Sequence, residues 1–289
     1  MYSLVPTGSQ DPSLHADPAV REYHIIVAED GTAADLCLSQ ASLLSQARIK
    51  HAMTCGAVWL TRGKSTQRLR RASRSLRVGD VLHLYYNEKL LGSTPPAPRL
   101  VADAGEFSVW DKPGQMLSQG SKWGDHWSIG RYAETNLQPQ RNGFVVHRLD
   151  RAASGLIMVA HGKRAAAALS ALFRNRQITK CYRVAVSGVI GEIGQLVDIH
   201  TPIDGRDARS KFEVLQTDTE QHRSLLNVWI ETGRKHQIRR HLSALGHPVI
   251  GDRFYGEATS GDLQLRAFRL EFLCPFTDVV RQFEIAAQI

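Results

Sequence analysis

The segment HRLDRAASGLIMVA, residues 147–160, constrains the fold of this chain more than any other part of the sequence. Its second half, GLIMVA, is a short apolar run of the kind that forms a strand buried inside a sheet. Arg148 and Asp150 precede the run and flank Leu149, so in an extended segment the two charged side chains point the same way. Packing does not require charged residues immediately before a buried strand. The pattern fits either an ion pair solvated at the strand end or a functional site.

The positive charge of the chain is concentrated in one segment. The 289 residues carry a net charge of +8, and 43% of them are hydrophobic, enough for a proper core in one large domain or two smaller ones. Residues 48–77 contain nine Lys and Arg residues and no Asp or Glu, so the rest of the chain is near neutral. A basic segment of this kind predicts a polyanionic partner, most simply nucleic acid. A solvated basic face is the alternative.

The cysteines and the N-terminus indicate where the protein works. Cys37, Cys55, Cys181 and Cys274 are far apart and form no CxxC pair, so zinc-finger spacing is absent. Scattered, unpaired thiols are typical of a reducing compartment. The first 20 residues lack the basic start and apolar core of a signal peptide, and no apolar run approaches the ~20 residues that span a bilayer. We therefore expect a soluble, cytoplasmic protein.

Residues 21–93 form a compact module in our prediction, after a loosely ordered polar tail over residues 1–20. Two helix-like stretches, broken near residues 40–42, are followed by the strand AVWL, the turn TRGKST and a second strand in VGDVLHLYY. The basic residues fall on the second helix and between the strands. This pattern resembles the ribosomal-protein-S-four-like RNA-binding module, and the resemblance implies a basic RNA-binding face.

Residues 94–289 are predicted to be a larger α+β domain, entered through the linker GSTPPAP. Strands are predicted at the start of FSVWDKPGQML and in TKCYRVAVSGVI and SLLNVWIETG. Helices are predicted in KRAAAALSALFRN and in RKHQIRRHLSALG, where Gly246 ends the helix. The fold class is thus a mostly antiparallel mixed sheet flanked by helices, preceded by a small α+β RNA-binding module.

Several catalytic motifs are absent from the sequence. There is no GxSxG, no HExxH and no GxxxxGK phosphate loop. His236 and His241 lie five residues apart, about 140° around a helix, and so do not face a shared metal ion. We predict no metal site, and most of the twelve histidines are expected to be packed or solvated.

Several motifs together identify a family. HRLDRAASGLIMVA matches the signature HRLDxxTSGLL, and ETGRKHQIRRHLSALGHPVIGDRFYG, residues 231–256, matches TGRxHQIRxHxxxxGHPIxGDxxYG. KCYRVAVSG resembles KxYxAxVxG, WDKPGQML resembles the NKPxGL segment, and TPIDGRDARSKFEVL, which lies between KCYRVAVSG and the second signature, resembles the family's intervening segment. Along the chain these motifs lie in the order found in the RluA family of pseudouridine synthases, and over roughly residues 106–273 the sequence resembles that family.

The resemblance implies isomerisation of a uridine within RNA, without a metal, nucleotide or redox cofactor. Asp150 matches the family's catalytic aspartate, which acts as a nucleophile or as a base at the ribose. Tyr182 matches the active-site tyrosine, which can stack on uracil and transfer a proton. Arg239 matches the arginine that keeps the aspartate ionised, since burial alone disfavours a charged carboxylate. Arg148 matches the residue that enters the RNA stack as the target base leaves it.

Spacing and composition add detail to this assignment. Arg239 lies three residues after His236 and three before Leu242, so one helix face can aim it inward while Arg240 points elsewhere. Ala153 stands where the family usually has Thr, which removes a hydroxyl contact but no catalytic group. Residues 152–155, AASG, are small enough to let the backbone approach the nucleotide. The expected RNA-binding residues of the module are Arg68, Arg70, Arg71, Arg74, Lys50 and Lys64.

Two other functions remain open from the sequence. The chain could be an RNA-binding protein on an inactive synthase scaffold, although Asp150, Tyr182 and Arg239 are all present. A glycosylase would be distinguished by the release of free uracil. The N-terminal module favours ribosomal RNA over transfer RNA as the substrate, and we expect a monomer.

Overall fold

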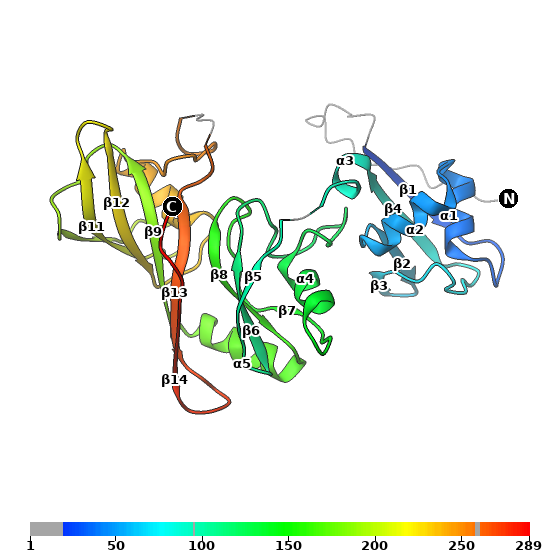
Figure 1. Ribbon diagram of the computed structural model, residues 1–289. Coiled ribbons are helices and arrows are strands. Elements are labelled where there is room, and N and C mark those ends of the chain that lie inside the picture. The colour runs from blue at the N-terminus through cyan, green and yellow to red at the C-terminus, as the bar shows by residue number, and fades with distance from the viewer. Residues whose placement is uncertain (1–19, 95, 258–260) are drawn as a thin grey trace. The chain divides into compact units, whose positions relative to one another are not determined.

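The computed structural model describes residues 20–94, 96–257 and 261–289. The chain divides into two compact units (Figure 1). The first contains the described part of Met1–Pro95 together with Gln119–Arg131, and the second contains Pro96–Ser118 and Tyr132–Ile289. We had assigned all of residues 94–289 to the larger domain, whereas the structure places Gln119–Arg131 with the first unit.

The first unit is built on a four-stranded antiparallel sheet. In spatial order its strands are β1 (Val20–Ile26), β4 (Val81–Asn87), β2 (Val58–Arg62) and β3 (Ser65–Arg68). Alternate residues of β4, namely Leu82, Leu84 and Tyr86, are buried in the core, as the period of two along a strand requires. The predicted strands β2 and β4 are confirmed. β1 and β3 were not predicted.

Two helices complete the core of this unit. They are α1 (Ala34–Ser42) and α2 (Gln46–Thr54), and a one-turn helix α3 (Glu88–Leu91) follows β4. The break between α1 and α2 comes at Leu43, whose φ is 59°, and Ser45 begins the second helix by accepting a hydrogen bond from the Arg48 amide. Gly56, at φ 78°, ends it. The predicted helix pair is confirmed, with its break slightly later than expected.

The second unit contains a ten-stranded mixed sheet, which confirms the predicted fold class. Only the pairing of β13 with β8 is parallel among the described strands, and the other pairings are antiparallel. Along the sheet the order is β10 (Leu196–Ile199), β11 (Ser210–Asp218), β12 (Arg223–Ile230), β9 (Ile178–Ser187), β13 (Leu265–Leu273), β8 (Ser154–Ala160), β6 (Phe107–Lys112) and β5 (Arg99–Asp103), with β14 (Val280–Glu284) on β13 and β7 (Phe144–Val145) on β8.

Three helices accompany this part of the chain: α4 (Ile129–Asn136), α5 (Lys163–Arg174) and α6 (Gln237–Ala244). The predicted helices α5 and α6 are confirmed. Helix α5 follows β8 directly and buries Ala165 and Leu169 in the core that β8 also lines (Figure 1). Residues 155–160 of β8 are all buried, as the apolar run GLIMVA predicts.

Gly155, at the start of β8, is required by strand packing. Its φ is 110°, and a Cβ at this position would collide with the backbone of Ala267 in β13. We had expected this glycine to let the backbone approach a nucleotide. In the structure the close neighbour is strand β13. The absence of a side chain at Gly155 therefore lets the start of β8 pack closely against β13.

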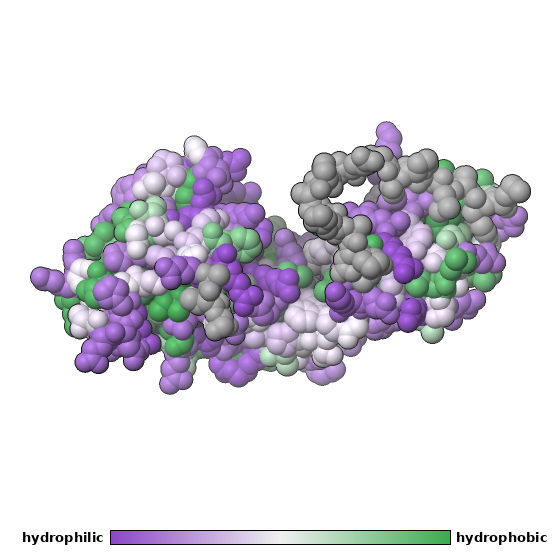
Figure 2. Space-filling view, turned by 90° about the horizontal axis from the view of Figure 1, so that it is seen from above, coloured by the Kyte–Doolittle hydropathy of each residue, from purple (hydrophilic) through white to green (hydrophobic). Residues whose placement is uncertain are grey.

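Large apolar side chains gather in the two cores, and the face seen in Figure 2 shows many hydrophilic residues with apolar ones scattered among them. All four cysteines are buried with free thiols. Among the described residues, no helix is long and apolar enough to cross a membrane. Nor do the described histidines, cysteines and acidic residues form a group that could hold a metal ion.

Candidate active site

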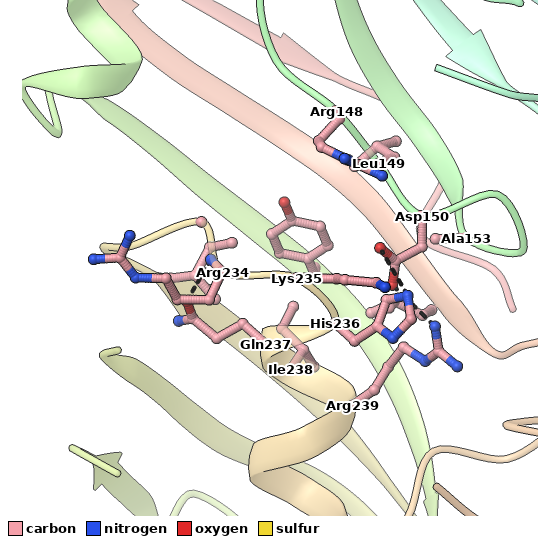
Figure 3. Close-up of a pocket in the computed structure, with 14 residues that line it drawn as sticks. Arg148, Leu149, Asp150, Ala153, Arg234, Lys235, His236, Gln237, Ile238 and Arg239 are labelled. Atoms are coloured by element: carbon pink, nitrogen blue, oxygen red, sulfur yellow. Dashed lines mark hydrogen bonds and ion pairs between the residues drawn. The ribbon is translucent and has the colours of Figure 1, made fainter. Parts of the chain in front are cut away.

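A cavity of about 210 Å³ in the second unit brings three of the predicted catalytic residues together. Asp150 comes from the loop before β8, Tyr182 from β9 and Arg239 from α6, and all three line this cavity. Figure 3 shows Asp150 facing His236 and Arg239, with Arg148 on the same loop. Residues 89 positions apart in the sequence thus converge on one space.

The loop that carries Asp150 is anchored through Leu149. The Leu149 side chain is buried, while Arg148 is exposed and Asp150 is half-buried. The Ser118 hydroxyl accepts a hydrogen bond from the Leu149 amide at 3.0 Å and donates one to the Leu149 carbonyl at 2.7 Å. The alternation predicted for Arg148, Leu149 and Asp150 is therefore present, although these residues form a loop and no strand.

Lys112 holds the other end of the same loop. Its side chain is fully buried, and its ammonium donates to the carbonyls of Ala153 at 2.6 Å, Met116 at 2.9 Å and Pro113 at 3.0 Å. Burial lowers the pKa of Lys112 to about 7, while the charges of Asp150 and Asp111 oppose that shift. The segment WDKPGQML pointed to the family, but we had not assigned Lys112 a role in positioning the site.

Arg239 is a buried cation shared by two carboxylates. Its Nη1 donates to Asp150 Oδ2 at 3.2 Å, and its Nε and Nη2 donate to the two oxygens of Asp252, each at 2.7 Å. Burial alone would lower the pKa of Arg239, but the bonds to Asp252 and Asp150 outweigh it and raise the pKa. Arg239 and Leu242 are buried on one helix face, as predicted, while Arg240 pairs with Asp204.

Asp252 is a residue of this site that we had not predicted. Its side chain is fully buried, and its Oδ1 also accepts hydrogen bonds from the amides of Phe254 and Tyr255. Burial would raise the pKa of Asp252, but the bonds from Arg239 and from the Phe254 amide lower it, so the carboxylate stays ionised. The motif GDRFYG contained this residue, yet its spacing from Arg239 gave no sign of contact.

His236 lies between Asp150 and Tyr255. Its backbone has a φ of 55° at the start of α6, and its Nδ1 is 2.9 Å from the Tyr255 hydroxyl. Its Nε2 is 3.9 Å from Asp150 Oδ1. Burial lowers the pKa of His236, with Asp150 opposing the shift, so the imidazole is neutral at neutral pH. It therefore adds a polar contact, and no fixed charge, beside the carboxylate.

Tyr182 lies in the middle of β9, and only 7% of it is exposed. Burial raises the pKa of its hydroxyl, and the negative charge of Asp150 raises it further. The phenol is therefore protonated at neutral pH. Its neighbour Cys181 packs into the hydrophobic core on the other side of the strand, as the alternation of side chains along a strand requires.

Comparison with known proteins identifies the family of the chain. Residues 106–244 match the family model described as RNA pseudouridylate synthase. The dual-specificity RNA pseudouridine synthase RluA of Vibrio vulnificus is 30% identical over 209 residues, which cover 64% of this chain and 81% of that protein. The chain belongs to the RluA-like family of RNA pseudouridine synthases.

Other relatives agree with this assignment. An uncharacterized RNA pseudouridine synthase of Aquifex aeolicus is 30% identical to this synthase over 239 residues, covering 75% of this chain and 74% of the relative. The solved structure of human RNA pseudouridylate synthase domain containing 1 covers 66% of this chain and is itself covered to 83%, with a TM-score of 0.56 and 24% identity. This likeness supports the fold. The synthase is thus an RNA isomerase.

The predicted RNA-binding arginines of the first unit fall into two groups. Arg68 and Arg70 are half-buried, and both pair with Asp125 of the segment Gln119–Arg131. Arg68 also donates to the carbonyls of Gly56 and Ser121, and Arg70 to that of Thr54. These two side chains therefore hold the segment against the helix pair and strands of their own unit.

The other predicted residues of the basic segment are exposed. Arg71 and Arg74 line a surface hollow of about 430 Å³ together with Arg77. Lys64 is exposed in the turn between β2 and β3. Lys50 is exposed on α2, and its Nζ lies 3.3 Å from Asp35 Oδ2. Arg77 was not among our predicted RNA-binding residues, although it ends the basic segment.

Arg239→Ala is expected to abolish activity and to lower the free energy of unfolding by about 3–5 kcal/mol, because it leaves Asp252 as an uncompensated buried charge. Arg239→Lys restores one charge but not the fork that spans two carboxylates, so its loss should be large but smaller. Urea unfolding and pseudouridine formation measure the two effects. The control on the same helix is Arg240→Ala, which breaks only a surface pair and should change little. Greater damage from Arg240→Ala would contradict the assignment.

Proposed function

We propose that this synthase converts specific uridines of structured RNA, with ribosomal RNA favoured over transfer RNA, to pseudouridine and uses Asp150 as its catalytic carboxylate. The observation that carries the proposal is the bond of Asp150 to the buried Arg239 at 3.2 Å in a cavity that Tyr182 also lines. A carboxylate paired with a fixed cation suits either role proposed for it, nucleophile or base at the ribose.

The reaction moves one bond and leaves the composition of the RNA unchanged. The glycosidic bond between the ribose and N1 of uracil breaks, the uracil turns, and the ribose bonds to C5. The proton on C5 is then lost and N1 gains one. Asp150 acts at the ribose in the first half of this sequence. Every step uses groups of the protein and the RNA alone.

Tyr182 is assigned to the base and to the proton on C5. Its ring offers a stacking surface in the cavity, and its hydroxyl is protonated at neutral pH because burial and Asp150 raise its pKa. A protonated phenol can take the C5 proton only while its own proton passes to another group. Asp150 is the carboxylate of this cavity, so we assign it as the acceptor.

Arg148 is assigned to the RNA stack. Its side chain is exposed at the cavity, next to the anchored Leu149. Chemistry at the glycosidic bond requires the target nucleotide to leave the stack, at a cost of a few kcal/mol. A cationic, planar side chain at the entrance can fill the vacated place and offset part of that cost.

The experiment that tests this function uses the purified protein with unmodified ribosomal and transfer RNA. Pseudouridines that form are mapped, and the same positions are examined in total RNA from cells that lack the gene. We expect new pseudouridine in ribosomal RNA and its loss from the deleted strain. Modification of transfer RNA alone would change the proposed substrate. Release of free uracil, or binding without any product, would overturn the proposal in favour of a glycosylase or an inactive scaffold.

We propose that the first unit is a ribosomal-protein-S-four-like RNA-binding module, formed by residues 21–93 together with Gln119–Arg131, and that the rest of residues 94–289 is the catalytic domain. Residues 1–19, most of the predicted tail, lie outside the described residues. The helix pair, small sheet and basic segment of the first unit support this assignment. Because Arg68 and Arg70 are engaged within the unit, we assign the RNA contacts to the exposed Arg71 and Arg74 with Arg77, and to Lys50 and Lys64.

Reversing Arg71, Arg74 and Arg77 to Glu is expected to weaken RNA binding and flatten its salt dependence. Each lost phosphate contact on single-stranded RNA should reduce the slope of log affinity against log salt by roughly 0.7. The chemical step for bound RNA should be nearly unchanged. Filter binding over a salt series and single-turnover rates measure the two effects.

Two controls make this test specific to the proposed face. Changing the exposed Arg164, Arg174 and Arg281 of the second unit to Glu alters the net charge by the same amount. This control variant should keep most of the wild-type slope of log affinity against log salt. Arg70→Glu should lower the thermal midpoint instead, because Arg70 pairs with Asp125 inside the unit. An unchanged slope in the triple variant would mean that this face does not bind RNA.

A further inference from the structure

A second cavity, of about 500 Å³, opens beside the first and shares its central residues. Asp150, His236 and Arg239, all labelled in Figure 3, line both cavities. The second cavity continues past them to Arg151, Arg253 and Phe254. No role proposed so far for this synthase uses that space. An RNA chain whose target nucleotide occupies the first cavity has its neighbouring nucleotide within one phosphodiester step of it.

The wall of the second cavity carries an exposed aromatic ring. Phe254 is 78% exposed, although a phenylalanine is ordinarily buried. The guanidinium of Arg239 lies 5.5 Å from the centre of this ring, and the ring of His236 lies 6.0 Å away, tilted by 31°. Phe254 thus presents a large apolar surface to solvent at the edge of the site.

The position of Phe254 is tied to the catalytic arrangement. Its amide donates to Asp252 Oδ1 at 2.9 Å, and the same carboxylate holds Arg239 through two bonds. The neighbouring Tyr255 donates its amide to the same oxygen and lies in hydrogen-bond range of His236. The backbone of Phe254 is therefore held in place before RNA arrives, which lowers the entropy cost of stacking on its ring.

The charges around the second cavity suit a phosphodiester. Arg253 and Arg151 are both exposed there, and the Nε of Arg151 donates to the Gln115 carbonyl at 3.2 Å. Within the described part of the chain, the Arg253 guanidinium has no hydrogen-bond or ion-pair partner. Asp262 also lines the cavity and disfavours a phosphate on its own side. An exposed arginine beside an exposed ring is a combination that recognises a nucleotide by its phosphate and by its base.

We propose that the second cavity binds the nucleotide next to the target uridine, with its base stacked on Phe254 and its phosphate held by Arg253. This inference rests on the proposed function of the Asp150 site. It adds a second point of recognition, so that the freedom of the flanking base to unstack contributes to the choice of uridine. Stacking tolerates any base, and the site therefore favours an unpaired neighbour over one particular letter.

The test is a double-mutant cycle between Phe254 and the flanking base. Synthetic RNA fragments that contain a uridine modified by the wild-type protein are prepared with an intact or an abasic nucleotide on each side of it. For the wild type, removal of one of the two flanking bases should lower kcat/KM roughly tenfold, within a range of about five- to a hundredfold. Phe254→Ala should show a similar loss on the intact fragment and almost none further on the abasic one.

Three further variants define the interaction. Phe254→Trp keeps a stacking ring and should retain most of the wild-type kcat/KM. Leu273→Ala removes an exposed apolar side chain elsewhere, and removal of the flanking base should lower its kcat/KM as much as it lowers that of the wild type. Arg253→Gln should weaken binding of both fragments equally, because it acts on the phosphate.

The outcomes separate this inference from the proposed function. A wild-type protein that modifies all fragments at the same kcat/KM, or a Phe254→Ala variant as active as the wild type, would overturn the second site while leaving the synthase assignment intact. Additive losses from Phe254→Ala and from the abasic position would also overturn it, since independent effects mean no contact. Absence of pseudouridine with the wild type on every RNA would remove both proposals.

Discussion

Asp150→Asn is expected to abolish pseudouridine formation while the fold and RNA binding persist. The amide keeps the shape of the side chain but loses the ionised oxygen that both proposed roles require, so the rate should fall by at least about 10³-fold. The fold should survive because Arg239 keeps its two bonds to Asp252. Tritium release from RNA labelled at C5 of uridine measures turnover, and filter binding measures affinity.

The matched control for this change is Asp198→Asn. Asp198 lies exposed on β10, away from both cavities, and the substitution removes the same charge from the same unit. Turnover of this variant should stay within about twofold of the wild-type value. A surface substitution of this kind rarely changes the stability by much, and Asp198 contacts neither cavity. Turnover by Asp150→Asn comparable to that of the control would refute the assignment of Asp150 and direct attention to another group of the cavity.

Tyr182→Phe should separate stacking from proton transfer. The variant keeps the ring, which is worth ~1–3 kcal/mol of stacking per base, so RNA should still bind. It lacks the hydroxyl, so the C5 proton cannot leave after the base is reattached, and the rate of product formation should fall by ~10²–10⁴-fold. Single-turnover measurements with excess enzyme isolate this step from product release.

Two observations would support or contradict this role for Tyr182. An RNA–protein species that accumulates in Tyr182→Phe and not in Asp150→Asn would place the block after the first bond is broken. Tyr132→Phe, on α4, removes the same atom outside the cavity and should be neutral. Near-normal single-turnover rates for Tyr182→Phe would leave the tyrosine as a stacking surface, and the proton would need another acceptor.

Local pattern was sufficient to predict the elements that carry the site. The apolar run GLIMVA predicted β8, because its length suits a strand that is buried on both faces and is too short for a buried helix. Three-residue intervals around Arg239 gave the buried face of α6, because periodicity along a helix maps directly onto direction.

Contacts between distant segments could not be predicted in the same way. Asp252 reaches Arg239 from a loop without periodicity, so no spacing argument applied to it. Arg68 and Arg70 were read as RNA-facing because their local surroundings contain no acid, yet Asp125, more than 50 residues later, neutralises part of their charge. β3, with the sequence STQR, has no apolar residue and forms only because β2 pairs with it. The number of charged residues along a chain does not reveal which of their side chains form ion pairs.

The placement of Gln119–Arg131 has a consequence for how the two units can be separated. The backbone passes from one unit to the other three times, near residue 95, after Ser118 and after Arg131. A single proteolytic cut in the linker therefore does not release either unit as an independent piece. A fragment that starts at residue 96 would carry the segment Gln119–Arg131 without Arg68 and Arg70, the ion-pair partners of its Asp125. A gene fusion that exchanges only the residues before the linker would separate Asp125 from Arg68 and Arg70 in the same way, so the two units are expected to stay together in one gene.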